Sequence, residues 1–79
     1  MSSQVYAASM KQLQNTVREH RTARRLTQAD LADIVGVSRQ TIVAVEKGEY
    51  TPSALLALSL ADAFGVAVED VFEIVEDGD

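Results

Sequence analysis

The sequence contains no cysteine and only one histidine, His20. Disulfides are therefore impossible, and a structural zinc site built from such ligands is not expected. No apolar run approaches the roughly 18 residues of a membrane span. The N-terminal MSSQVYAASMKQ also lacks the basic start and long apolar core of a signal peptide. These absences predict a cytoplasmic protein with no metal, no cofactor and no membrane partner.

The residues that enzymes use for catalysis are equally scarce. There is no cysteine nucleophile, the one histidine has no obvious partner, and no glycine-rich loop is present to hold a phosphate. With 79 residues, the chain should form one domain with a small core that is marginally stable alone. The sequence thus predicts a binding domain and not an enzyme.

Basic residues are absent from the second half of the chain. From Glu49 onward there are eight acids and no base, whereas the part before Gly48 has seven bases against four acids and a net charge of +3. The overall charge of -5 therefore hides a basic half, which is suited to an anionic partner. The seven bases are Lys11, Arg18, Arg21, Arg24, Arg25, Arg39 and Lys47.

The spacing of apolar residues predicts an all-α fold of five helices and leaves room for a short terminal β-strand. A first helix is expected over about Met10–Arg25, with Leu13 and Val17 one turn apart. Thr27 and the residues up to Asp30 resemble a capping box that starts a second helix, ending at Gly36. The buried stripe of this second helix is expected to be Leu31, Ile34 and Val35.

Three further helices are expected after Gly36. Ser38 should cap the third, which ends at Gly48, and Pro52 opens a fourth that runs to Phe64. A fifth, of one or two turns, is expected over residues 68–72. The buried stripe of the fourth helix is expected to be Leu55, Leu58, Ala61 and Phe64.

Two segments are candidate strands, FEIVE at residues 72–76 and the stretch at 3–8. The chain is expected to divide into an N-terminal extension (1–9), a compact domain (10–72) and an acidic tail (73–79).

The first turn of the third helix is rich in hydrogen-bonding side chains. Arg39, Gln40 and Thr41 follow the cap, while Ile42 and Val45 point inward. Arginine can bond guanine O6 and N7 as a fork, and glutamine can bond adenine N6 and N7 in the same way. Two helices joined by a short glycine-containing turn can place the second one in a DNA major groove. Polar first turns are also ordinary on surface helices, so this segment alone leaves both interpretations open.

A longer segment decides between them. LTQADLADIVGVSRQTIVAVEKGEYTP (26–52) resembles the Cro/phage-repressor helix-turn-helix family almost position by position, with matches at Leu26–Gln28, Gly36–Ser38 and Glu46–Gly48. The resemblance extends over about Thr16 to Phe72. It implies a five-helix, lambda-repressor-like domain that binds double-stranded DNA and regulates transcription, with repression as the expected action.

The resemblance also implies which residues contact DNA. Arg39 and Gln40 fall on base-reading positions, and Gln28 falls where the second helix holds a phosphate. Arg21 and Glu46 match a pair that joins the first helix to the reading helix, so they are expected to form a structural ion pair. The full expected DNA-contacting set is Gln28, Ser38, Arg39, Gln40, Thr41, Val43, Ala44, Lys47 and Tyr50.

Two positions leave alternatives open. Arg25 stands where the family usually has a glycine or a small polar residue, so it could add a phosphate contact or only tolerate a strained turn. Tyr50 is either a phosphate ligand or a packed loop aromatic.

Assembly and partners can also be anticipated. A small domain without disulfide or metal gains stability by oligomerising, so we expect an isologous homodimer. FEIVE would pair as an edge strand with its mate or with Gln4–Ala8. The alternative for the whole chain is a protein-interaction module on the same fold, such as an antitoxin or anti-repressor, and genomic neighbours would discriminate. The expected dimer contacts are Val66, Val68, Val71, Phe72, Ile74 and Val75.

Overall fold

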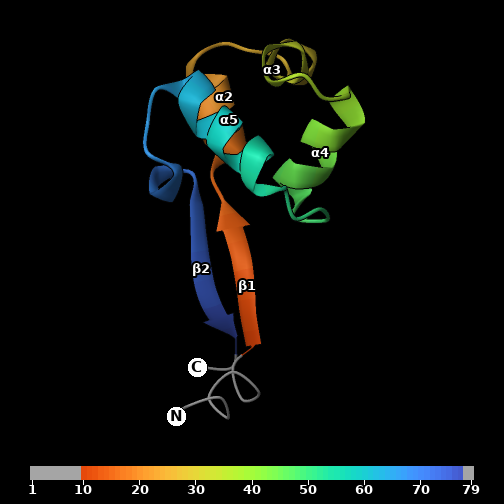
Figure 1. The fold of residues 1–79 in the computed structure, drawn as a ribbon. Helices are drawn as coiled ribbons and strands as arrows, with labels where there is room; N and C mark the ends of the chain where they lie inside the picture. The colour runs from red at the N-terminus through yellow and green to blue at the C-terminus, as the bar shows by residue number, and fades with distance from the viewer. Residues whose placement is uncertain (1–9, 78–79) are drawn as a thin grey trace.

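The computed structural model describes residues 10–77, which form four α-helices, one 3-10 turn and a two-stranded sheet. The helices pack together into one body, and the two strands project from it as a ribbon (Figure 1). In chain order the elements are β1 (Met10–Asn15), α2 (Val17–Ala23), α3 (Gln28–Val35), α4 (Arg39–Lys47), α5 (Ala54–Phe64), η1 (Val68–Asp70) and β2 (Phe72–Asp77).

The first helix is shorter than its sequence pattern indicated. Helix α2 begins at Val17, and the residues before it form β1, so the prediction of a helix from Met10 was wrong. Strand β1 pairs antiparallel with β2, which places Leu13 opposite Ile74. Because this partner lies near the other end of the sequence, local periodicity held no signal for it. The expected fifth helix is also reduced, to the 3-10 turn η1.

The prediction of a C-terminal strand is confirmed. Strand β2 covers Phe72–Asp77, so the boundary expected between the domain and its acidic tail falls at the start of this strand. Within the chain β2 pairs with β1. The candidate strand at residues 3–8, and with it the expected pairing to Gln4–Ala8, lies outside the described residues.

The ends of α3 follow the capping signals in the sequence. Thr27 Oγ1 accepts the backbone N–H of Asp30, and Asp30 Oδ2 accepts the backbone N–H of Thr27, both at 2.9 Å. This reciprocal pair satisfies two of the amide groups that a helix N-terminus leaves unpaired. Gly36 ends the helix at a φ of 77°, a conformation that glycine adopts without steric cost.

The hydrophobic core lies where the helices meet, and its largest fully buried side chains are Leu31, Ile42, Leu60, Val17, Val45 and Val71. Two predictions of inward faces were wrong. Ile34 is 56% exposed, and α5 buries Leu56 and Leu60 in place of Leu55 and Leu58. Helix α5 is apolar on nearly every side, so its sequence contained two competing stripes.

The end of α5 is fastened to α2. Arg24 Nη2 donates to the carbonyl of Phe64 at 2.7 Å, and the guanidinium lies 5.1 Å from the centroid of the Phe64 ring. The ring of His20 stacks on the same aromatic ring, with centroids 5.2 Å apart. A cation at this point is favourable because helix C-termini carry partial negative charge. None of the helices described between residues 10 and 77 is long and apolar enough to cross a membrane.

Candidate nucleic-acid interface

Helix α4 begins with the serine cap that the sequence predicted. Ser38 Oγ accepts the backbone N–H of Thr41 at 3.2 Å and lies 2.9 Å from the Thr41 hydroxyl. Both hydroxyls were expected to contact DNA, and in the structure they contact each other. Their first role is therefore to hold the first turn of α4 in shape.

The two side chains that follow the cap extend from this turn without a partner. Arg39 and Gln40 are exposed and make no hydrogen bond or ion pair within the described part of the chain. Ile42 and Val45, on the opposite side of the same helix, are fully buried. Helix α4 is thus anchored to the core by one face and presents donors and acceptors on the other.

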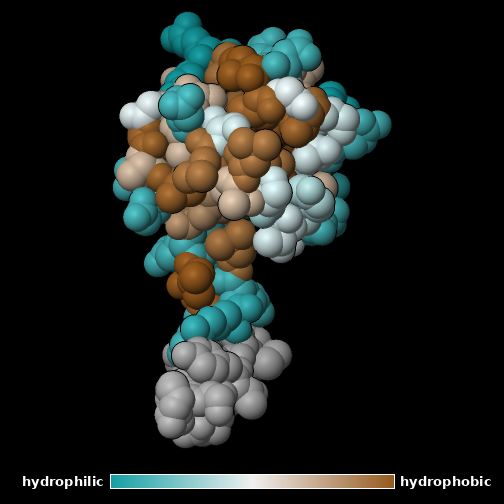
Figure 2. Space-filling model, in the orientation of Figure 1, coloured by the Kyte–Doolittle hydropathy of each residue, from teal (hydrophilic) through white to brown (hydrophobic). Residues whose placement is uncertain are grey.

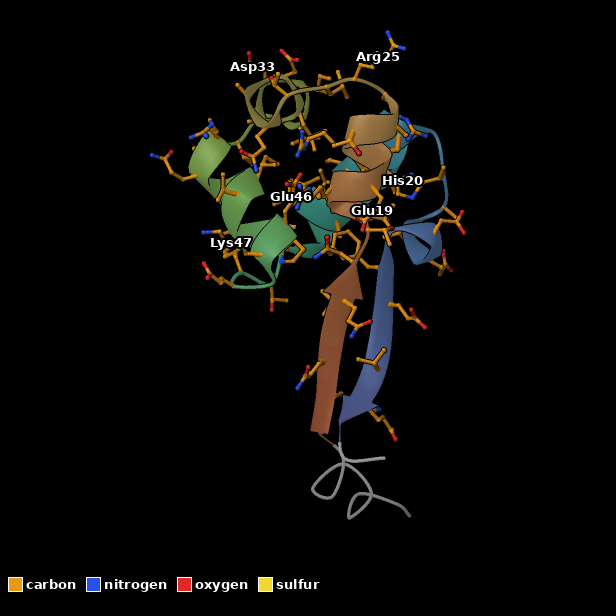
Figure 3. The ribbon with its side chains drawn as sticks, turned by 180° about the vertical axis from the view of Figure 1, so that it is seen from behind. Glu19, His20, Arg25, Asp33, Glu46 and Lys47 are labelled. Carbon is orange, nitrogen blue, oxygen red and sulfur yellow. The ribbon has the colours of Figure 1, made fainter. Side chains whose placement is uncertain are left out.

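The rest of α4 continues this outward surface. Val43 and Ala44 are partly exposed in the second turn, and they offer small apolar groups beside the polar first turn. Lys47 is exposed at the end of the helix and points away from the body (Figure 3). Tyr50, in the loop that follows, is 47% exposed, which argues against a packed loop aromatic.

A nearly buried group of three polar side chains fixes α4 to α2 and α3. Glu46 accepts from Arg21 Nε at 2.6 Å and from Arg21 Nη2 at 3.2 Å, and Gln28 Nε2 donates to the same carboxylate at 3.1 Å. Arg21 Nη1 also donates to the carbonyl of Leu26 at 2.8 Å. We call Arg21, Gln28 and Glu46 the Glu46 cluster.

The cluster changes the expected role of Gln28. Its side-chain amide was expected to hold a phosphate, but Nε2 is directed inward to Glu46. As the first residue of α3, however, Gln28 has a backbone N–H outside the helical ladder, at the positive end of the helix dipole. An anion can therefore be bound there by the main chain.

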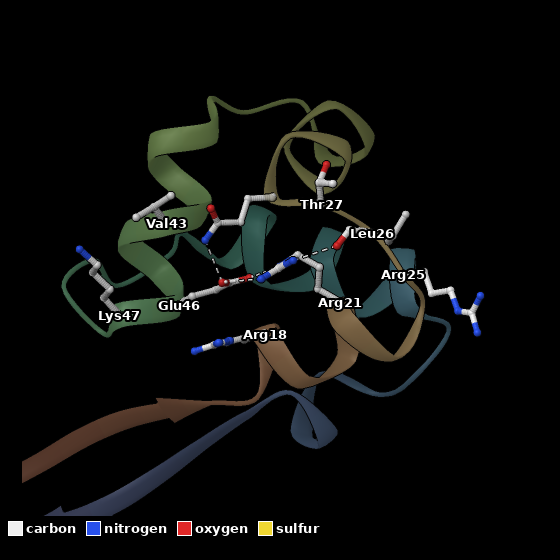
Figure 4. Close-up of a pocket in the computed structure, with 9 residues that line it drawn as sticks. Arg18, Arg21, Arg25, Leu26, Thr27, Val43, Glu46 and Lys47 are labelled. Atoms are coloured by element: carbon white, nitrogen blue, oxygen red, sulfur yellow. Dashed lines mark hydrogen bonds and ion pairs between the residues drawn. The ribbon is translucent and has the colours of Figure 1, made fainter.

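A basic pocket of about 490 Å³ opens beside the Glu46 cluster, between α2 and α4 (Figure 4). We call it the α2–α4 pocket. Arg18 and Lys47 lie at its opening and have no ion-pair partner among residues 10–77. The only acid in its lining, Glu46, is neutralised by Arg21. Arg18 was not among the residues expected to contact DNA, although it precedes Arg21 by three residues and so shares its helix face.

Arg25 extends outward at the other end of the same lining (Figure 4). Its φ of 58° makes it the only residue other than glycine with a positive φ in the described chain. For a residue with a Cβ this conformation is strained. The turn between α2 and α3 therefore combines backbone strain with an exposed positive charge.

The pKa of Asp30, in the first turn of α3, is lowered by the helix cap. The backbone N–H of Thr27, followed by its side chain, lowers the pKa of the Asp30 carboxyl below its ordinary value. The cause is direct, because both hydrogen bonds favour the ionised form.

The residues expected at a dimer contact differ in how exposed they are to solvent. Val71 is 2% exposed within its own core, so that expectation was wrong, and Val66, Val68 and Phe72 pack partly against the same core. Of the remaining two, Ile74 is 66% exposed and Val75 is partly buried.

A larger apolar surface lies on α5. Leu55 is 77% exposed and Leu58, one turn later, is 56% exposed. Figure 2 shows hydrophobic side chains gathered over this side of the body and continuing onto the ribbon. Figure 3 is turned by 180° from this view, and it labels Lys47 of α4.

Comparison with known proteins gives concordant matches. The helix-turn-helix family model matches residues 17–71. An HTH-type transcriptional regulator of Methanocaldococcus jannaschii is 52% identical over 65 residues, which cover 82% of this chain and 97% of that protein. The regulator YgzD of Bacillus subtilis is 46% identical over 65 residues, covering 82% and 98%.

Two solved structures are also similar. The restriction-modification controller protein C.AhdI of Aeromonas hydrophila is 35% identical with a TM-score of 0.65, covering 68% of this chain and 82% of that one. The clp gene regulator ClgR of Corynebacterium glutamicum is 30% identical with a TM-score of 0.65, covering 68% of this chain and 57% of that one.

Proposed function

Since this chain belongs to the Cro/C1-type helix-turn-helix family and is a DNA-binding transcriptional regulator, we propose that α4 lies in the major groove and reads base edges with Arg39 and Gln40. One observation carries the proposal. These two side chains have no partner in the described chain, and they extend from a helix whose other face is buried.

The chemistry of α4 suggests the bases that it prefers. Arg39 fits guanine through O6 and N7, and Gln40 fits adenine through N6 and N7. Val43 and Ala44 have only apolar groups to offer, and these fit the methyl group of thymine. The preferred half-site therefore contains neighbouring guanine and adenine. It also contains a thymine at the position that faces the second turn of α4.

The phosphate backbone is held by a second set of groups. Lys47 and Tyr50 bind phosphates beside the face of α4 that reads bases. The backbone N–H of Gln28 binds a phosphate at the start of α3. Arg18 and Arg25 extend the basic surface across α2. Ser38 and Thr41 are proposed to bind phosphate only through the shared hydroxyl pair. These contacts position α4 without reading sequence.

We propose repression as the action of the bound protein. A domain seated in the major groove occludes the DNA that it covers. Transcription in vitro from a template with a selected site should fall as the protein is added, and activation would contradict this part of the proposal.

Two copies are proposed to bind one operator as a two-fold dimer through α5. Leu55 and Leu58 form an exposed apolar stripe, and Asp62 is the only charged residue of this helix. A helix that is apolar on nearly all sides is normally buried, so the open side is suited to a second copy. A two-fold axis here would set two α4 helices on successive major-groove faces, about 34–36 Å apart.

Selection from random duplex DNA tests the reading surface. We expect enrichment of two inverted half-sites, each with adjacent guanine and adenine, spaced by one turn of DNA. Binding without any enriched sequence would overturn base reading by α4 and favour the protein-interaction alternative.

Light scattering tests the dimer surface. Leu58→Lys should halve the measured mass, because it places charges against each other across the two-fold axis. Ile34→Lys is the matched control, since Ile34 on α3 has the same exposed fraction of 56%. A dimer that survives Leu58→Lys, or that dissociates equally with Ile34→Lys, contradicts the placement on α5.

A further inference from the structure

The ribbon of β1 and β2 leaves both of its outer edges unpaired by any strand of the described chain. It extends away from the helices, so none of the described helices lies along most of its length (Figure 1). An isolated two-stranded ribbon is at best marginally stable in water, and a third or fourth strand normally completes it. The ribbon is therefore the part of the fold that gains most from an additional strand.

One face of the ribbon carries an exposed apolar pair. Leu13 and Ile74 are directly opposite each other in the register, and they are 37% and 66% exposed. Residues that face each other across an antiparallel pair lie on the same side of the sheet. Adding a strand beside β1 or β2 would extend this pair into a longer apolar row.

The two edges differ sharply in charge. Strand β2 (Phe72–Asp77) includes three acids, Glu73, Glu76 and Asp77, whereas β1 (Met10–Asn15) includes none and a single lysine. Charged side chains on an edge strand are a common barrier to further pairing. Two β2 strands side by side would bring at least four glutamate carboxylates together. Two β1 strands would bring together only two lysines among four glutamines and two asparagines.

We propose that β1 pairs antiparallel with β1 of a second copy of this chain, which joins two ribbons into a four-stranded sheet in the order β2–β1–β1–β2. In a register centred on Leu13, this leucine faces Leu13 of the second copy. Gln12 then faces Gln14, and Lys11 faces Asn15, so no like charges oppose each other. The apolar row becomes Ile74–Leu13–Leu13–Ile74 across the whole sheet.

This contact is separate from the one proposed on α5, so it goes beyond the proposed function. The α5 contact joins the two copies on one operator, whereas the ribbon contact joins dimers on neighbouring operators. A six-residue edge is a small interface and should associate weakly in dilute solution. Binding to adjacent sites on one DNA molecule raises the effective concentration, and the weak contact then becomes cooperative.

The position of the edge relative to α4 supports such coupling. Asn15, the last residue of β1, donates from Nδ2 to the carbonyl of Val45 in α4 at 2.9 Å, and its Oδ1 accepts the backbone N–H of Val17 at 3.0 Å. The base of the ribbon is therefore held directly against the reading helix.

Single cysteines test the pairing cleanly, because the natural chain has none. Leu13→Cys is compared with Ile74→Cys in the full chain, each combined with Leu58→Lys to weaken the α5 contact. Oxidation at high protein concentration should convert Leu13→Cys to a disulfide-linked dimer with a yield several times that of Ile74→Cys. Equal yields, or no covalent dimer with Leu13→Cys, would overturn the proposal. No DNA is needed, so this result is independent of base reading.

A charge test provides a second measurement. Leu13→Glu opposes two carboxylates at the centre of the proposed sheet, and Ile74→Glu puts the same charge on its outer strands. With Leu58→Lys present in every chain to weaken the α5 contact, Leu13→Glu should abolish the concentration-dependent rise in mass, and mixing it with Leu13→Lys should restore the rise. Ile74→Glu should leave it unchanged. Equal losses with both glutamate variants, or no rescue by the mixture, would count against pairing through β1.

Discussion

Arg21 and Glu46 form a two-pronged ion pair that joins α2 to α4, with only 12% and 6% of their side chains exposed. Both oxygens of the Glu46 carboxylate accept hydrogen bonds from Arg21, and Gln28 donates a third bond to it. Its charge is therefore balanced inside the fold by Arg21. The pair therefore ties α4 to α2.

Glu46→Ala should lower the free energy of unfolding by roughly 3–5 kcal/mol, since it leaves the Arg21 charge without a partner in a nearly buried site. Urea unfolding measures the change. Glu49→Ala is the control, because Glu49 is an exposed acid just beyond the same helix, and it should cost less than about 1 kcal/mol. An unchanged urea midpoint together with impaired DNA binding would make Glu46 a functional residue instead.

Gln40→Ala should leave the fold intact and weaken binding to the selected operator by about 1–3 kcal/mol for each half-site, with relaxed preference at one base. Lys47→Ala should weaken all sequences alike and reduce the slope of log affinity against log salt by about 1. Titrations of wild type and both variants at several salt concentrations separate the two effects. Unchanged base preference in Gln40→Ala would place base reading elsewhere.

Arg25→Gly should stabilise the fold while weakening DNA binding. Glycine relieves the left-handed strain at a φ of 58°, and the gain should be up to about 1 kcal/mol after the larger chain entropy of the unfolded state is counted. The same change removes one cation and should lower the salt slope of DNA binding by about 1. Thermal unfolding and DNA titration are measured on the same sample. A variant that binds DNA like wild type would limit Arg25 to the turn.

Asp30→Asn should lower stability at neutral pH and lose this effect in acid. The hydrogen bonds from Thr27 depress the pKa of Asp30 in the folded chain. The stabilisation is therefore complete above the unfolded pKa and disappears as the pH falls through the folded pKa. Urea unfolding of wild type and variant should give two curves that converge at low pH. A gap that stays constant down to strongly acidic pH would argue that the charge of Asp30 contributes nothing.

The helix boundaries around the reading surface could be predicted because their signals are local. Thr27 and Asp30 form reciprocal hydrogen bonds within one turn. Ser38 caps α4 by accepting the backbone N–H of Thr41, three residues later. Gly36 and Gly48 then end α3 and α4 in the left-handed conformation that such positions need. Each of these interactions connects residues only a few positions apart, so the sequence pattern contains the whole interaction.

The failures concern interactions between distant residues. Met10–Asn15 has an acceptable helical composition, and only pairing with β2 makes it a strand. In α5, Leu55 and Leu56 are equally apolar, and packing against the other helices decides that only Leu56 is buried. The inward direction of the Gln28 amide likewise depends on Glu46, eighteen positions later. None of these choices can be read from a window of one or two turns.

The pairing of β1 with β2 also constrains the order in which the elements can fold. Met10 lies opposite Asp77 in the register, so the ribbon closes a loop that includes every helix of the described residues. Such closure carries a large entropic cost until the intervening chain is compact. On a ribosome, α2 to α5 can therefore pack before the last strand has emerged. A chain that lacks β2 would keep α4 and would leave β1 without a partner strand within the described residues.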